Sequence, residues 1–269
     1  MGKFNSVLIA SDFDGTLTDI NGQIPYRNIE AIKYFISQGG NFTVSTGRTK
    51  AGFHDYRKDI INAPVLLGNG AMAYDYADEK IVFTNGINEE NSSVLRTILR
   101  QKSPLCMECY GVDDKSYVFN INNESKSHFK GLRINDYIEL TRLEESCFPF
   151  VKVMISAGTR TFEIQDYLKS IDMCTMKFIP CTGSYIEILS ESAGKGSALM
   201  QLAEYLGVTA ENAYAVGDGS NDVDMLETAA TGFVPCSGNP LALAAADVVV
   251  CSSNDGCIAD VVAYLDKKY

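Results

Sequence analysis

A short apolar run near the start of the chain ends in two acids, and this combination restricts the folds that the chain can adopt. The run comprises residues 7–10 (VLIA), and Asp12, Asp14, Gly15 and Thr16 follow it. A continuous apolar strand is typical of a parallel sheet that is covered on both faces. Open α/β sheets bind their ligands at the carboxyl ends of the strands. The stretch therefore predicts a buried parallel strand that delivers two carboxylates to a ligand site.

Later segments repeat this pattern of a strand that ends in polar residues. The residues concerned are Thr46, Gly47 and Arg48 after a strand at 41–45, Asn69 after a strand at 65–67, and Asp218, Asn221 and Asp222 after a strand at 213–216. Apolar residues at helical spacing separate the strands, and one such helix begins at Gly194-Lys195-Gly196. This alternation of strands and helices predicts an α/β fold with a parallel sheet.

The alternation is interrupted in the middle of the chain. A hairpin is expected over residues 71–84, and a helix near 92–102 is followed by strands that include 116–121, 151–156 and 185–189. The βα rhythm returns after residue 190. We therefore expect a Rossmann-like parallel-sheet core formed by residues 1–84 and 190–269, with a second domain of α+β character inserted at residues 85–189.

Composition and charge exclude several classes of function. The chain has 269 residues, a formal net charge of −11, and ordinary shares of hydrophobic (46%) and charged (21%) residues. Nucleic acids and anionic membranes both require a basic surface, so neither is expected as a partner. No apolar run approaches the roughly 20 residues of a membrane helix, and no secretory signal is evident. These features predict a cytoplasmic protein. The sequence leaves its oligomeric state open between a monomer and a small homo-oligomer.

The polar strand ends and the lysine are expected to meet at one edge of one sheet. Carboxylates that gather in this way repel one another unless a cation neutralises them. Hard oxygen ligands without imidazole or thiolate favour Mg²⁺. The sequence therefore predicts a Mg²⁺ site, with candidate ligands Asp12, Asp14, Asp218 and Asp222.

These residue types suit phosphoryl transfer. An ionised carboxylate such as Asp12 can attack phosphorus if a metal and Lys195 offset its repulsion from the substrate. Asp14 is placed to protonate the leaving oxygen and later to act as a base, because nearby negative charges favour its protonated form. Thr46 and backbone N–H groups near Asp14 and Gly47 are expected to hold the phosphoryl oxygens.

The motifs DFDGT, STGR, GKG and GDGSND, in this order, resemble those of the haloacid dehalogenase-like (HAD) hydrolase superfamily. The long insert before the lysine resembles the Cof-type subfamily (IIB), which carries a C2-type cap. The resemblance covers nearly the whole chain. It implies Asp12 as nucleophile, Asp14 as acid–base and as a backbone-carbonyl Mg²⁺ ligand, Thr46 and Lys195 as phosphate binders, Asp218 as a direct Mg²⁺ ligand, and Asn221 and Asp222 as supporting residues.

Further residues are candidates for binding the substrate. Gly47 and Asn221 are grouped with the phosphate binders, and Asp222 is either a direct metal ligand or a residue that supports one. Asn69 stands where the resembled family carries a polar Asn-Gly pair, so contact with the substrate is expected there. Arg48 is a second candidate contact, and a surface ion pair is the alternative for it.

The expected function is that of a Mg²⁺-dependent phosphatase acting on small phosphorylated metabolites, such as sugar phosphates, through an aspartyl-phosphate. Its specificity should reside in the inserted domain. A phosphomutase on the same fold is the first alternative, and it would need a bisphosphate to begin turnover. A non-enzymatic regulator that binds a phosphorylated metabolite is the second. A dehalogenase is disfavoured, because displacement of a halide has no use for Asp14 or for the metal carboxylates.

Overall fold

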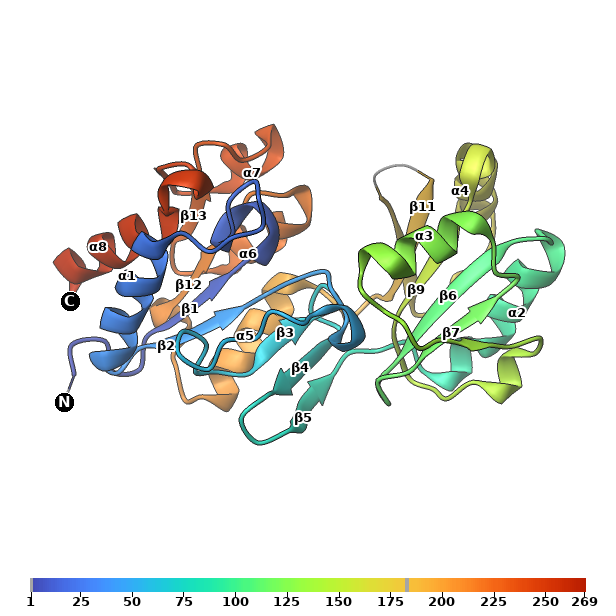
Figure 1. The fold of residues 1–269 in the computed structure, drawn as a ribbon, viewed down its shortest axis with the longest axis horizontal. Helices are drawn as coiled ribbons and strands as arrows, with labels where there is room; N and C mark the ends of the chain where they lie inside the picture. The colour runs from blue at the N-terminus through green and yellow to red at the C-terminus, as the bar shows by residue number, and fades with distance from the viewer. Residues whose placement is uncertain (1, 182–183) are drawn as a thin grey trace. The chain divides into compact units, whose positions relative to one another are not determined.

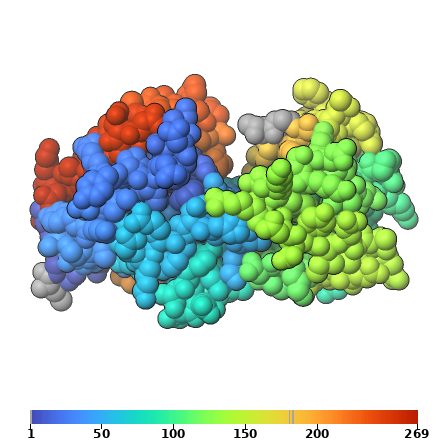
Figure 2. Space-filling model, viewed as in Figure 1, coloured from blue at the N-terminus to red at the C-terminus, as the bar shows by residue number. Residues whose placement is uncertain are grey.

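The structure is a computed structural model that describes residues 2–181 and 184–269. These residues form two compact units. The first comprises the chain up to Gly47, Asp55–Phe83 and Gly194–Tyr269, and the second comprises Arg48–His54 and Thr84–Ala193. In Figure 2 the red C-terminal residues lie against the blue N-terminal ones, so both ends of the chain belong to one packed body. Across the described ranges, no helix has the length and apolar character to cross a membrane.

The first unit is built on a five-stranded parallel sheet with the order β14-β13-β12-β1-β2 (Figure 1). Its strands are β1 (Leu8–Ser11), β2 (Asn41–Val44), β12 (Ala213–Val216), β13 (Gly232–Pro235) and β14 (Val248–Val250). Leu8 pairs with Ala213 on one side and with Asn41 on the other, and all four residues of β1 are buried. The predicted buried parallel strand is therefore confirmed.

Helices bury this sheet. Leu8 and Ala10 of β1 share a core cluster with Leu199 and Leu202, while α1 and α8 pack against each other beside β2 and β14. Because neighbouring strand residues point to opposite faces, Ile9 is buried on the other side of β1. The helices of this unit are α1 (Tyr26–Ser37), α5 (Lys195–Tyr205), α6 (Val223–Thr228), α7 (Pro240–Ala245) and α8 (Cys257–Lys268).

A small three-stranded sheet extends the first unit. It consists of β3 (Val65–Leu67), β4 (Met72–Asp75) and β5 (Lys80–Thr84), with the hairpin that the sequence predicts between the last two strands. A single parallel bridge between Ser45 and Leu66 places β3 beside the end of β2. The turn that follows β3 therefore lies close to the segment that leaves β2.

The second unit is an α+β body with a six-stranded sheet of order β10-β11-β9-β6-β7-β8. Among the described residues, its strand pairs are antiparallel except that of β7 with β8. The strands are β6 (Cys106–Gly111), β7 (Ser116–Phe119), β8 (Ile138–Glu139), β9 (Phe150–Ser156), β10 (Met176–Pro180) and β11 (Tyr185–Ser190), and the helices are α2 (Ser92–Gln101), α3 (Asn123–Gly131) and α4 (Thr161–Ser170).

A short segment from the N-terminal part of the chain belongs to this second unit. Arg48–His54, which the sequence-based division assigns to the first domain, groups with it. Lys50 Nζ lies 3.0 Å from Asp114 Oδ2, and His54 Nε2 lies 3.2 Å from the carbonyl oxygen of Leu132. The chain therefore passes from one unit to the other at this segment as well as at the two ends of the insert.

Candidate active site

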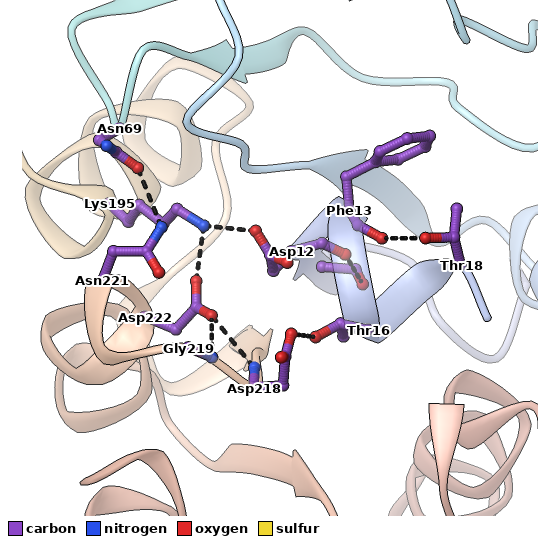
Figure 3. A network of polar contacts seen from close by, with 11 residues as sticks. Asp12, Phe13, Thr16, Thr18, Asn69, Lys195, Asp218, Gly219, Asn221 and Asp222 are labelled. Atoms are coloured by element: carbon purple, nitrogen blue, oxygen red, sulfur yellow. Dashed lines mark hydrogen bonds and ion pairs between the residues drawn. The ribbon is translucent and has the colours of Figure 1, made fainter. Parts of the chain in front are cut away.

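The candidate site lies at the carboxyl ends of β1 and β12, beside the start of α5 (Figure 3). Asp12 directly follows β1, and its N–H donates to the carbonyl oxygen of Val216 at 2.8 Å, so the two strands run together up to the site. Asp218 follows β12, and Lys195 is the first residue of α5. Adjacent parallel strands end at the same edge of a sheet, which explains why residues more than 180 positions apart meet here.

Lys195 is the centre of the polar network. Its ammonium donates to Asp12 Oδ1 and to Asp222 Oδ1, each at 2.6 Å, and only 1% of the residue is exposed. Burial alone lowers the pKa of the ammonium, but the charges of Asp12 and Asp222 outweigh it and raise the pKa above its ordinary value. Lys195 is therefore held charged beside the Asp12 side chain.

Asp222 uses both of its oxygens within the protein. Oδ1 accepts from Lys195, and Oδ2 accepts from the N–H groups of Asp218 at 3.1 Å and Gly219 at 2.8 Å. These bonds fix the turn that leaves β12 and orient the Lys195 side chain. These bonds suit a supporting role, and both expected roles of Asp222, direct metal ligand and supporting residue, stay predictions.

Asp218 is held by a residue to which the sequence analysis assigned no role. Thr16 Oγ1 donates to Asp218 Oδ1 at 2.6 Å. The turn Phe13–Leu17 brings Thr16 there, and Gly15 within it has φ +86°. A Cβ on Gly15 would lie 2.8 Å from Asp218 Oδ2, so only glycine allows this approach. The sequence feature that could have indicated this contact was the hydroxyl of Thr16, two residues after Asp14.

Three of the four candidate carboxylates lie together in a group that can hold a cation. One oxygen from each of Asp12, Asp218 and Asp222 lies within 4.8 Å of the others. The Asp14 side chain is exposed and outside this group, because the tight turn at Asp14 and Gly15 redirects the chain just after Asp12. The oxygen-only donor set fits Mg²⁺. The expected roles of Asp14, as proton donor and as a carbonyl ligand, stay predictions.

The acid–base properties of Asp12 follow from its position. Burial is the largest cause that raises its pKa, Lys195 lowers it, and the charges of Asp222 and Asp218 raise it, so that the net pKa lies above the ordinary value, at about 8. Burial also raises the pKa of Asp218. A bound cation favours the ionised carboxylates, so a metal ion and protons compete for this group.

The expected phosphate-binding and substrate residues lie around a second hydrogen-bonded pair. Asn221 Nδ2 donates to Asn69 Oδ1 at 3.1 Å, and the N–H of Asn69 donates to the Thr46 carbonyl oxygen at 3.0 Å. A Cβ on Gly47 would lie 3.1 Å from Asn69 Oδ1. Asn69 thus joins the segments after β2 and β12, whereas Arg48 groups with the second unit.

The start of α5 is positioned by backbone contact. A Cβ on Gly70, which has φ +86°, would lie 2.1 Å from the carbonyl oxygen of Gly194, so the turn after β3 packs directly on the residue before the helix. The N–H of Gly196 donates to Asp224 Oδ2 at 3.1 Å. Asp224, which the sequence analysis did not single out, therefore ties α6 to the first turn that carries Lys195.

Comparison with known proteins agrees with this architecture. The family model described as haloacid dehalogenase-like hydrolase matches residues 9–262. A relative from Bacillus subtilis, named 5-amino-6-(5-phospho-D-ribitylamino)uracil phosphatase, is 26% identical over 246 residues, which cover 82% of this chain and 84% of that protein.

Solved structures show the same fold. A HAD subclass IIB sugar phosphatase superposes with a TM-score of 0.82 at 20% identity, covering 97% of this chain and 99% of that one. A protein from Thermotoga maritima gives a TM-score of 0.84 at 23% identity, covering 96% and 97%. The expected α/β fold, with a parallel-sheet HAD core and an inserted cap, is thereby confirmed. The chain belongs to the haloacid dehalogenase-like hydrolases.

Proposed function

We propose that this hydrolase is a Mg²⁺-dependent phosphatase of small phosphorylated metabolites, such as sugar phosphates. The observation that carries the proposal is the buried ammonium of Lys195, 2.6 Å from Asp12, next to a group of three carboxylates. A carboxylate can approach an anionic phosphoryl group only where fixed positive charge offsets the repulsion between them. This site has one such charge in the protein and a donor set for a second.

In the proposed reaction, Asp12 attacks phosphorus and the ester oxygen leaves with a proton from Asp14. The product of this step is an aspartyl-phosphate and an alcohol. Asp14 then takes a proton from water, which attacks phosphorus, releases inorganic phosphate and restores the Asp12 carboxylate. Mg²⁺, when bound by Asp12, Asp218 and the Asp14 carbonyl, supplies positive charge that lowers the repulsion in both steps.

The remaining polar residues are proposed to hold the phosphoryl group. Thr46, Gly47 and Asn221 offer a hydroxyl, a backbone N–H and an amide near the end of β2, and Lys195 adds its charge. Two of these residues are linked through Asn69, so a shift of one segment displaces the other. Asp222 keeps Lys195 and the Asp218 turn in place.

The substrate class is supported by relatives rather than by a pocket. The Bacillus subtilis relative is named for a phosphorylated ribitylamino-uracil, and one structural neighbour is named a sugar phosphatase. Both names describe small phosphorylated metabolites. Choice among such metabolites is proposed to reside in the inserted domain, residues 85–189, with Arg48 and Asn69 as further candidate contacts.

A panel of sugar phosphates and nucleotides, assayed for release of inorganic phosphate, tests the proposal. We expect release that requires Mg²⁺ and that needs no bisphosphate. Turnover that begins only after addition of a bisphosphate would instead support the phosphomutase alternative. Activity that is unchanged in Asp12→Asn, or unchanged by a chelator, would overturn the mechanism.

A further inference from the structure

The second unit contains a pocket of about 540 Å³ that the proposed reaction does not use. It lies between α2 and the segment of residues 140–144. None of its lining residues belongs to the Asp12 group or to the phosphate-binding residues. We propose that this pocket binds a small organic anion that has a flat aromatic body, and that it does so independently of the catalytic centre.

The floor of the pocket is apolar. Phe119 and Leu143 are each only 2% exposed, and the partly buried Leu99 and Leu140 pack on the same core cluster. Ligand pockets of this size are usually lined by apolar and aromatic side chains that bury the body of the ligand. A planar apolar body therefore fits this floor, whereas a fully hydrated inorganic ion gains little from it.

The rim of the pocket is cationic. Arg96 and Arg100 lie four residues apart on α2, and therefore on one face of that helix, and Arg142 lies on the facing segment. Glu144 is the one carboxylate among the lining residues, so the rim has a surplus of two positive charges. In a chain with a net charge of −11, such a local surplus points to an anionic ligand.

The three arginines differ in whether their guanidinium groups form ion pairs. Glu144 forms an ion pair with Arg96, and Arg142 Nε lies 3.9 Å from Glu144 Oε2. Within the described part of the chain Arg100 makes no hydrogen bond or ion pair, so its guanidinium is available to a ligand. A guanidinium binds an anionic group through paired N–H donors and also stacks on aromatic rings.

A second hollow of the same unit has a different charge. It measures about 320 Å³ and its lining residues include Asp114 and Asp136 against a single lysine, Lys115. Cationic rims are therefore not a general property of the hollows in this unit. The pocket beside α2 differs from this hollow in combining an unpaired arginine with an apolar floor.

Two fluorescent probes separate the charged and apolar contributions. 8-Anilinonaphthalene-1-sulfonate has an aromatic body and a negative charge, whereas N-phenyl-1-naphthylamine has a similar body and no charge. With the full chain, Arg100→Gln is expected to weaken binding of the sulfonate about tenfold, since one charge-assisted contact is lost. Binding of the amine is expected to stay the same. Glu144→Gln is expected to tighten binding of the sulfonate, because it removes the competing carboxylate and frees Arg96.

Two control variants test whether the change in sulfonate binding arises at this pocket. Lys169→Gln removes an exposed charge of α4 outside the pocket, and Asp12→Asn changes the catalytic group; both are expected to bind the sulfonate as the wild type does. Circular dichroism checks that each variant is folded. Equal sulfonate binding by wild type and Arg100→Gln, or equal losses for both probes, would overturn the proposal. Because the readout is binding, the proposal survives a failure of the proposed phosphatase activity.

Discussion

Each unit of the molecule buries a group of charged side chains, and the two groups differ in how completely their atoms are paired. In the first unit, Lys195 contacts Asp12 and Asp222 at 2.6 Å, and the second oxygen of Asp222 accepts two backbone N–H groups. In the second unit, Lys152 lies 3.5 Å from Glu187. The contacts of the first group are short, and this contact of the second unit is longer.

In the second unit, the hydrogen bonding of the buried Glu108 carboxylate is incomplete. Glu108 is fully buried on β6, and its Oε2 accepts from the Tyr110 hydroxyl and contacts His128 Nδ1, both at 2.7 Å. Its Oε1 is buried without a hydrogen-bond partner among the described residues. A buried carboxylate oxygen without a hydrogen-bond partner lowers stability. In the first group, by contrast, the charges of the lysine and the carboxylates offset one another.

The two groups also arise from the sequence in different ways. Asp12, Lys195 and Asp222 lie in short motifs at strand and helix ends. Glu108 and Glu187 lie on the two strands that flank β9, and each pairs opposite Met154 in the antiparallel sheet. Such a register depends on pairing between distant strands and leaves no local motif. The comparison therefore predicts large effects for changes in the first group and smaller effects for changes in the second.

The largest effect is expected from Asp12→Asn. An amide cannot serve as the nucleophile, so the rate of phosphate release should fall by a factor on the order of 10⁴ or more. The fold should persist, because the substitution removes a buried charge and keeps the shape of the side chain. Phosphate release and a thermal melt of the same sample measure both quantities. Asp78→Asn, in an exposed turn, is the control and should retain activity; an Asp12→Asn variant that is as active as Asp78→Asn would contradict the prediction.

Removing the lysine from each group compares the two directly. Lys195→Met leaves two buried carboxylates without their counterion and should lower the free energy of unfolding by about 3–5 kcal/mol in the absence of metal. Lys152→Met breaks a longer contact and should cost less, about 1–2 kcal/mol. Urea unfolding of both variants measures the difference. Equal costs would show that the two lysines are equally well paired and would contradict the prediction.

The third effect concerns protons and metal. Because Asp12 has a pKa of about 8 without metal, it is largely protonated at pH 6, and a metal ion must displace that proton. Affinity for Mg²⁺ should therefore rise with pH, by up to about tenfold per unit below pH 8, and stop rising above it. Calorimetric titration in two buffers with different ionisation enthalpies counts the protons released. Buffer-independent heats at pH 6.5 would contradict the prediction, and Asp12→Asn should abolish the proton release.

The sequence allows much of the fold and of the first group to be predicted. The strand ends carrying Asp12 and Asp218 and the helix start at Lys195 follow from apolar patterning, and all three residues meet as expected. The bond from Thr16 to Asp218 was missed, because it depends on how one turn curls. Asp14 is exposed because of the conformation of the same turn.

The second unit was harder to predict. Within α4, Phe162 is 81% exposed, since helical spacing identifies a helix but does not reveal which apolar residues reach the core. The segment Arg48–His54 groups with the second unit through Lys50 and His54, contacts that join residues 64 and 78 positions apart. Interactions of this range require the tertiary structure.

The smallest effect is expected from Glu108→Gln. Glutamine keeps one oxygen to accept from Tyr110 and His128 and replaces the charged oxygen that has no partner with a neutral NH2 that has none either, so the free energy of unfolding should change by less than about 1 kcal/mol. Glu108→Ala removes the acceptor as well, leaves the Tyr110 hydroxyl buried and unpaired, and should cost about 2–3 kcal/mol. Urea unfolding of the two variants separates the charge from the acceptor. If glutamine costs as much as alanine, the charge of Glu108 is itself stabilising, and the second group is as tightly organised as the first.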